Sequence, residues 1–66
     1  MRSKLLAFRK EKGFTRKSIA EELKITESFY GKIERGTRNP TLDLAKSISK
    51  LLGAHSIDEL FFKNGE

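Results

Sequence analysis

The sequence predicts an all-α fold of five short helices in a single domain over residues 1–66. Apolar residues recur every three or four positions, whereas no segment alternates with the period of two that a strand requires. Threonine or serine precedes most apolar segments, where a side-chain oxygen accepts a hydrogen bond from a free helical N–H group. Glycine follows several of them, as is typical of helix C-termini. A chain of this length forms one small domain at most.

The first predicted helix covers residues 2–12, and the second begins at Thr15. In the first helix Leu5 and Phe8 are three positions apart, and Gly13 ends the helix. Thr15 is a suitable N-cap for the second helix. The apolar stripe of this second helix consists of Ile19, Ala20 and Leu23.

The third predicted helix begins after Thr26 and ends at Gly36, following a very short turn at residues 24–25. Its central Gly31 costs a helix roughly 0.5–1 kcal/mol relative to alanine. At about 100° per residue, the helix has two distinct faces. The apolar face holds Phe29, Tyr30 and Ile33. The polar face holds Glu27, Ser28, Gly31, Lys32 and Arg35. We therefore expect Gly31 on the outward face, where its missing side chain lets another surface approach the backbone.

Two further helices are predicted after the loop of residues 37–40, whose Asn-Pro pair disfavours a helix. Thr41 caps the fourth helix, and Gly53 closes it. One face of this helix is marked by Leu42, Ala45, Ile48 and Leu52. The segment Ser56–Glu59 fits the S-x-x-E capping box, which opens a fifth helix that runs through Phe62.

Charge is distributed unevenly along the chain. The net charge is +5, and the isoelectric point is near 9.8. Residues 1–20 contain seven of the fourteen basic residues and a single acidic residue, Glu11. Such a positive pole favours a polyanionic partner such as nucleic acid. The alternative is that these basic residues are only solvated surface residues.

The composition disfavours several classes of protein. The absence of cysteine excludes disulfides and thiolate metal sites, and we expect neither a metal nor a cofactor. No apolar run approaches the ~18–20 residues that cross a bilayer, and no signal-peptide core is evident, so we expect a cytoplasmic protein. One histidine, one tyrosine and no thiol provide no recognisable catalytic group, so we do not expect an enzyme.

The second and third helices, joined by a tight turn in a basic domain, have the order of a helix-turn-helix. In that arrangement the second helix of the pair lies in the major groove of DNA. The alternative for the polar face is a solvated surface with an incidental glycine. The surrounding sequence decides between these two interpretations. Its informative fragments are FRKEKGFT (residues 8–15), IA (19–20), Leu23, IT (25–26), IERG (33–36), RNPTL (38–42) and IDELF (57–61).

In this order and spacing, the fragments resemble the phage-repressor/Cro-like (XRE-type) family of helix-turn-helix transcriptional regulators from Leu5 to Phe61. The resemblance implies a compact lambda-repressor-like domain that binds double-stranded DNA. It also implies a sequence-specific regulator, most simply a repressor that occupies a promoter of a bacterium or its mobile element. The alternative is a protein-binding module with the same fold, such as an antitoxin or an antirepressor.

The resemblance also implies DNA contacts by position. Base contacts are implied for Glu27, Ser28, Phe29, Gly31 and Lys32. Phosphate contacts are implied for Thr15, Arg16, Lys17, Arg35, Arg38 and Asn39. Lys32 can donate to guanine, and Glu27 can accept from cytosine. Glu27 has the alternative role of an acid that favours the helix dipole, and Phe29 that of a residue at the margin of the core.

Three positions depart from the family pattern. Arg16 replaces the usual glutamine and can bind phosphate, but it cannot reproduce the paired hydrogen bonds of an amide. Lys24 replaces a common glycine, so we expect it in a left-handed conformation at a cost of about 1 kcal/mol. Tyr30 replaces a branched aliphatic residue and needs room or a hydroxyl partner. By analogy with the family, Arg9 and Glu34 are expected to form a partly buried pair that links the first and third helices.

Small regulators of this type commonly dimerise through their C-terminal region. We therefore expect a homodimer with Leu51 and Phe62 at the interface. A two-fold dimer would read a symmetric operator with half-sites about one helical turn apart. The alternative is that Phe61 lies in the core and Phe62 is loosely exposed. Without a separate sensor domain, binding would be controlled by concentration, by another protein or by competition for DNA.

Overall fold

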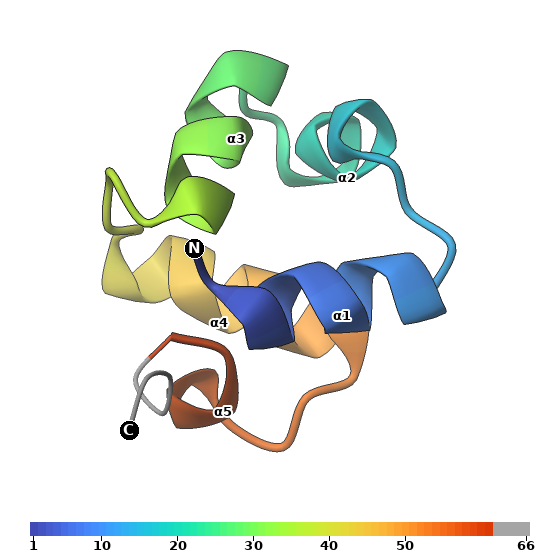
Figure 1. The fold of residues 1–66 in the computed structure, drawn as a ribbon, viewed down its shortest axis with the longest axis vertical. Coiled ribbons are helices and arrows are strands. Elements are labelled where there is room, and N and C mark those ends of the chain that lie inside the picture. The colour runs from blue at the N-terminus through green and yellow to red at the C-terminus, as the bar shows by residue number, and fades with distance from the viewer. Residues whose placement is uncertain (62–66) are drawn as a thin grey trace.

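The computed structural model describes residues 1–61, which form five helices (Figure 1). They are α1 (Ser3–Glu11), α2 (Arg16–Leu23), α3 (Glu27–Arg35), α4 (Leu42–Leu52) and α5 (Ile57–Phe61). The predicted all-α fold is confirmed, and the helices lie where the sequence places them. The predicted extension of the last helix to Phe62 lies outside the described residues.

Threonine side chains start three of the helices, as predicted. Thr15 Oγ1 accepts a hydrogen bond from Ser18 N–H at 3.0 Å, and Ser18 Oγ accepts one from Thr15 N–H at 2.9 Å. This reciprocal pair is a capping box at the start of α2. Thr26 and Thr41 each accept from the N–H three residues later, at 3.0 and 3.2 Å. Each cap stabilises its helix by about 1 kcal/mol relative to alanine.

Left-handed residues end three of the helices. Gly36 and Gly53 close α3 and α4 with φ of 89° and 74°. Lys24 closes α2 with φ of 62°, so the predicted left-handed lysine is confirmed. Among residues 1–61 it is the one non-glycine residue with positive φ. Its side chain therefore costs about 1 kcal/mol that a glycine would avoid.

Two details of the last helices differ from the sequence prediction. Leu42 is predicted on the apolar face of α4 but is 59% exposed, because it begins the helix at the edge of the domain (Figure 1). The predicted capping box at Ser56–Glu59 does not form. The N–H of Glu59 donates to the backbone carbonyl of Ser56 at 3.3 Å, and Glu59 Oε1 accepts from His55 N–H at 3.0 Å. The carboxylate therefore caps one residue earlier than the motif predicts.

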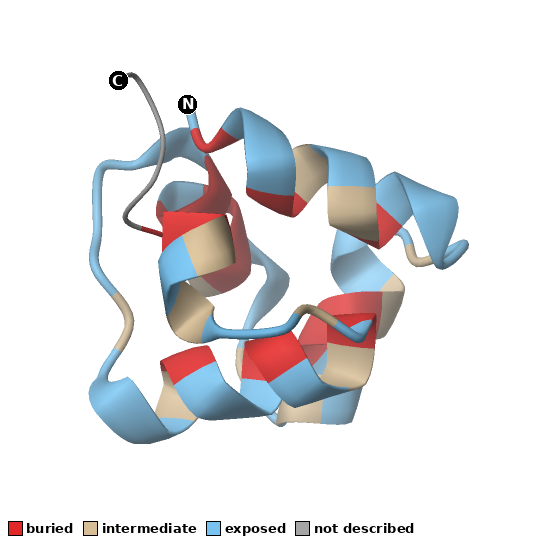
Figure 2. Ribbon diagram, turned by 90° about the horizontal axis from the view of Figure 1, so that it is seen from below, coloured by how far each residue is buried: buried red, intermediate tan, exposed pale blue. Residues whose placement is uncertain are grey.

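All five helices contribute to the core, as the buried segments in Figure 2 show. α1 packs against α3 and α5, whereas α4 packs against α2 and α5. The buried apolar residues are Leu5, Ile19, Ala20, Tyr30, Ile33, Ala45, Ile48, Leu52, Leu60 and Phe61. No helix within residues 1–61 has the length and apolar character that would span a bilayer.

Candidate nucleic-acid interface

α2 and α3 pack against each other across the turn of residues 24–26 (Figure 1). The N–H of Lys24 donates to the carbonyl of Glu21 at 3.2 Å, and the N–H of Ile25 donates to that of Ala20 at 3.0 Å. These bonds satisfy carbonyl groups that the end of a helix leaves free. The half-buried Ile25 packs against the core, so both backbone hydrogen bonds and apolar packing hold the turn in place. The result is the geometry of a helix-turn-helix.

All but two of the predicted DNA-contact residues are exposed. On α3 these are Glu27, Ser28, Lys32 and Arg35. At the start of α2 they are Thr15, Arg16 and Lys17, and after α3 they are Arg38 and Asn39. Within this set of exposed residues, Glu27 carries the single negative charge among five basic side chains. These exposed residues of α2, α3 and the following loop are therefore polar, and their net charge is positive.

Phe29 is the first exception, because it is half-buried and packs against the core. The guanidinium carbon of Arg38 lies 5.8 Å from the centre of its ring, which is within the range of a cation–π contact. Phe29 is thus placed at the margin of the core and partly under an arginine. This position agrees with the alternative considered for it from the sequence.

Gly31 is the second exception, because it lies on the outward side of α3 but is not exposed. It is buried because the side chain of Arg35, one turn later, covers it. A Cβ at this position would lie 3.4 Å from Arg35 Nη1, and within residues 1–61 Arg35 is the only side chain beyond its immediate neighbours that the Cβ would meet within 4 Å. Gly31 therefore lies on the outward side of α3, beneath a long exposed side chain that can move.

Replacing Gly31 by alanine is expected to raise the free energy of unfolding by roughly 0.5–1 kcal/mol, because alanine favours the helix and the added methyl group meets only a flexible arginine. Thermal unfolding monitored by circular dichroism measures this change. The same substitution is expected to weaken binding to a specific DNA site if the backbone at Gly31 approaches the bases. Unchanged affinity would show that the glycine has no part in the contact.

The structure contains the predicted ion pair between α1 and α3. Arg9 Nε donates to Glu34 Oε1 at 2.9 Å, and Arg9 Nη2 donates to Glu34 Oε2 at 3.1 Å. Arg9 Nη1 also donates to the backbone carbonyl of Phe14 at 2.8 Å. The pair is more deeply buried than predicted, since Arg9 is 6% and Glu34 is 2% exposed. Its two parallel bonds fix α3 to α1 in one orientation.

The ion pair shifts the pKa values of both partners. Burial alone would raise the pKa of Glu34, but the hydrogen bonds of Arg9, the nearby Tyr30 hydroxyl and the charge of Arg9 together outweigh burial, and the net pKa is lowered. The charge of Arg16, which lies at the start of α2, adds a smaller lowering of the same pKa. The hydrogen bond from Glu34 raises the pKa of Arg9. Both groups are therefore held in their charged forms.

Tyr30 finds room in the core but no partner for its hydroxyl group. The residue is completely buried, and its hydroxyl oxygen makes no hydrogen bond within the described part of the chain. Burial, together with the nearby charge of Glu34, raises the pKa of this hydroxyl. The folded protein therefore holds a neutral tyrosine beside the Arg9–Glu34 pair.

Replacing Tyr30 by phenylalanine is expected to raise the free energy of unfolding by about 1 kcal/mol, because it removes a buried hydroxyl without a partner. The raised pKa adds a pH dependence to this effect. Stability from the neutral tyrosine is complete below the unfolded pKa near 10 and is lost as pH rises through the higher folded pKa. Denaturant unfolding of the wild type and the variant at pH 7 measures the stability difference, and the same experiment at pH 11 measures its pH dependence. A less stable phenylalanine variant at pH 7 would contradict this interpretation.

The positive pole is smaller on the surface than in the sequence, because two of its arginines are buried. Arg9 belongs to the ion pair, and Arg2 is only 9% exposed. Arg2 binds the end of α3 and the loop after it, a role that the sequence prediction missed. Its partners are 31 to 37 residues away in the chain, so no local sequence pattern predicts these hydrogen bonds. The exposed basic residues of the pole are Lys4, Lys10, Lys12, Arg16 and Lys17.

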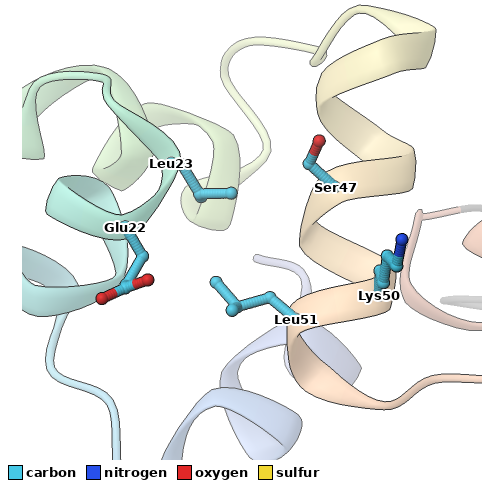
Figure 3. Close-up of a pocket in the computed structure, with 5 residues that line it drawn as sticks. All are labelled: Glu22, Leu23, Ser47, Lys50 and Leu51. Atoms are coloured by element: carbon cyan, nitrogen blue, oxygen red, sulfur yellow. The ribbon is translucent and has the colours of Figure 1, made fainter.

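Leu51, predicted at a dimer interface, lies beside an open groove between α2 and α4 (Figure 3). It is half-buried, and it packs against the core. The other residues that line the groove are Glu22, Leu23, Ser47 and Lys50. Phe62, its predicted partner at the interface, lies outside the described residues.

Comparisons with known proteins give a consistent assignment. Residues 5–60 match the helix-turn-helix family. The chain is 42% identical over 53 residues to the uncharacterized HTH-type transcriptional regulator YqaF of Bacillus subtilis, an alignment that covers 80% of this chain and 70% of that protein. It is 40% identical over 57 residues to YazB, named in the same way, of the same species, with 86% and 81% covered.

A third relative comes from an archaeon. The chain is 34% identical over 61 residues to an uncharacterized HTH-type transcriptional regulator of Methanothermobacter thermautotrophicus, with 92% of this chain and 88% of that protein covered. No solved structure matches the chain with comparable significance.

The family match, these relatives and the geometry of α2 and α3 agree. The matched family consists of DNA-binding transcription regulators and is not a class of enzymes. The match spans all five helices, from α1 to the first turn of α5. The resemblance predicted from the sequence fragments is therefore confirmed. The chain belongs to the phage-repressor/Cro-like (XRE-type) family of helix-turn-helix transcriptional regulators.

Proposed function

We propose that the protein is a sequence-specific repressor that acts in the cytoplasm and occupies a promoter as a homodimer. The observation that carries this proposal is the exposed polar face of α3, which holds Glu27, Ser28 and Lys32, together with exposed basic side chains on α2 and on the following loop. The major groove of B-DNA is wide enough to admit a helix. A helix placed there with this face inward brings all three side chains to the base edges.

Each part of the surface has a distinct role in this proposal. Lys32 donates to guanine O6 or N7, Glu27 accepts from cytosine N4, and Ser28 bonds to either type of base. Phe29 touches a thymine methyl group at the edge of the contact, and Gly31 approaches the bases once Arg35 moves aside. Phosphate contacts position the helix without reading sequence. They come from Thr15, Arg16, Lys17, Arg35, Arg38 and Asn39.

The homodimer brings two copies of α3 to successive turns of one DNA face. Its interface is expected in the C-terminal region, as the family resemblance implies, with Leu51 and Phe62 as the predicted contributors. A two-fold axis between the copies requires a symmetric operator whose half-sites are about one helical turn apart. Occupation of such a site within a promoter excludes the polymerase, which accounts for repression.

Selection from random duplex DNA tests the proposal. Purified protein is incubated with the duplexes at two salt concentrations, and the retained DNA is sequenced. We expect enrichment of a two-fold-symmetric motif with half-sites about one turn apart. Guanine and cytosine are expected at the positions that face Lys32 and Glu27. Sedimentation equilibrium on the same sample measures the oligomeric state.

Two results would contradict the proposal. Retention without enrichment that collapses as salt rises would mean phosphate attraction alone, and it would favour the protein-binding alternative of an antitoxin or antirepressor. Enrichment of a single asymmetric half-site by a monomer would contradict the proposed homodimer but would agree with the proposed base contacts.

A further inference from the structure

We propose that Arg2 is a positioning residue that holds the end of α3 and the loop of residues 37–40 in the arrangement that binds DNA. The proposal rests on the function proposed above, since it assigns a role to the surface around α3. Arg2 lies immediately before α1 and far from α3 in sequence. No local signal in the sequence points to it.

Four hydrogen bonds connect Arg2 to the segment from α3 to Asn39. Its backbone N–H donates to the carbonyl of Glu34 at 2.9 Å. Its Nη1 donates to the carbonyl of Ile33 at 2.7 Å and to that of Arg38 at 3.3 Å. Its Nη2 donates to Asn39 Oδ1 at 2.7 Å. A single residue therefore binds the last turn of α3 and the far part of the loop together.

The end of α3 needs such a donor for two reasons. The last carbonyl groups of a helix have no partner within the helix, and its C-terminus favours a positive charge. The planar guanidinium group places several donors in one fixed fork, which a lysine cannot do. Arg2 therefore donates from Nη1 to a free carbonyl group at the end of α3 and from Nη2 to the side chain of Asn39 in the loop.

Apart from the contact of Arg38 with the ring of Phe29, the loop has few other restraints at its far end. Thr37 and Arg38 donate their N–H groups to the carbonyl of Lys32, at 3.0 and 3.3 Å, which holds the near end. Residues 36–39 are all exposed and bury little apolar surface that could order them. Beyond this point the bonds from Arg2 hold the carbonyl of Arg38 and the side chain of Asn39. These two residues are proposed phosphate contacts.

Arg2 acts through other residues and does not itself face DNA. It is only 9% exposed, and its terminal nitrogens donate within the protein. Its guanidinium carbon lies 5.4 Å from the centre of the Phe61 ring, so α5 supports it from the other side. Arg2 thus joins α5 to the end of α3.

Replacing Arg2 by lysine tests this role, because R2K keeps the positive charge and loses the fork. If the loop of R2K is in the binding arrangement about one-tenth of the time, affinity for the selected operator falls about tenfold. Affinity for a scrambled duplex is also expected to fall, because Arg38 and Asn39 are proposed phosphate contacts that do not depend on sequence. Amide hydrogen exchange at Thr37 and Arg38 is expected to become faster. The control K4R exchanges one basic residue for another at an exposed site of α1 and is expected to match the wild type.

Wild-type operator affinity and unchanged exchange in folded R2K would overturn the proposal. A loss of affinity in R2K that comes with faster exchange throughout residues 1–61 would also overturn it, because it would indicate a general defect of the fold. If the wild-type protein selects no motif, the proposed function fails, and faster or unchanged exchange in R2K still decides whether Arg2 positions the loop.

A second measurement on the wild-type protein does not depend on the folding of a variant. Guanidinium NMR signals of Arg2 are expected to stay unchanged when operator DNA is added, whereas those of Arg38 shift. A shift of the Arg2 signals as large as that of Arg38 would mean direct contact with DNA and would overturn the positioning role.

Discussion

Replacing Glu34 by glutamine is expected to lower the free energy of unfolding by about 3–5 kcal/mol, because it leaves Arg9 buried without its counter-charge. The core of a domain this small rarely supplies more than about 3–5 kcal/mol in total. The variant is therefore expected to be largely unfolded at 37 °C. Thermal unfolding followed by circular dichroism measures the loss.

Two controls separate the ion pair from the loss of one charge. E21Q makes the same chemical change at an exposed position of α2 and is expected to leave stability nearly unchanged. The double replacement of Arg9 by methionine and Glu34 by leucine removes both charges and is expected to recover much of the loss. An E34Q protein as stable as E21Q would show that the pair contributes nothing to folding.

Lowering the pH should also remove the stabilisation by the Arg9–Glu34 pair in the wild-type protein. The folded pKa of Glu34 is lowered by Arg9, so the stabilisation is complete above the unfolded pKa of about 4.3 and is lost as pH falls through the folded value. Unfolding curves between neutral and acidic pH should therefore converge for wild-type protein and E34Q. Curves that stay equally far apart at every pH would contradict this origin of the effect.

Replacing Lys32 by alanine is expected to weaken binding to the selected operator by roughly 10- to 100-fold, because a good side-chain contact to a base discriminates by about 1–3 kcal/mol. Lys32 is exposed on the polar face of α3, where its loss is expected to affect the reading of sequence. Fluorescence anisotropy with the operator and with a scrambled duplex of the same composition measures the two affinities. Sequence preference at the facing guanine is expected to relax.

The matched control is K46A, which removes the same charge from an exposed position of α4, outside the helix-turn-helix. Both variants are expected to lose a similar, small affinity for the scrambled duplex. A loss of operator affinity that is the same in K32A and K46A would mean that Lys32 contributes only charge and reads no base.

The sequence predicts the helices well because the signals that define them are local. A threonine that caps α2, α3 or α4 acts on an N–H three residues later, and the left-handed Lys24 is set by the tight turn beside it. The Arg9–Glu34 pair came from the family pattern and not from the residues alone. Its deep burial depends on how α1 and α3 pack, which the chain does not display locally.

The features that sequence reasoning missed depend on distant contacts or on side-chain conformation. Gly31 is buried because Arg35 folds back over it, and helical angles alone describe only the direction in which a residue points. Arg2 counts as surface charge in the sequence, yet it is buried by a loop 37 residues away. Both features depend on long basic side chains, whose apolar stems allow a place in the interior as well as in water.

The left-handed Lys24 also bears on how such a regulator can diverge. A glycine at that position would recover about 1 kcal/mol, an amount comparable to the cost of a typical single substitution. The present chain could therefore gain stability by a substitution at this exposed residue, which is not among the predicted DNA contacts. A duplicate gene that first acquired this glycine could accept a destabilising change on α3 and move to a new operator while it stays folded.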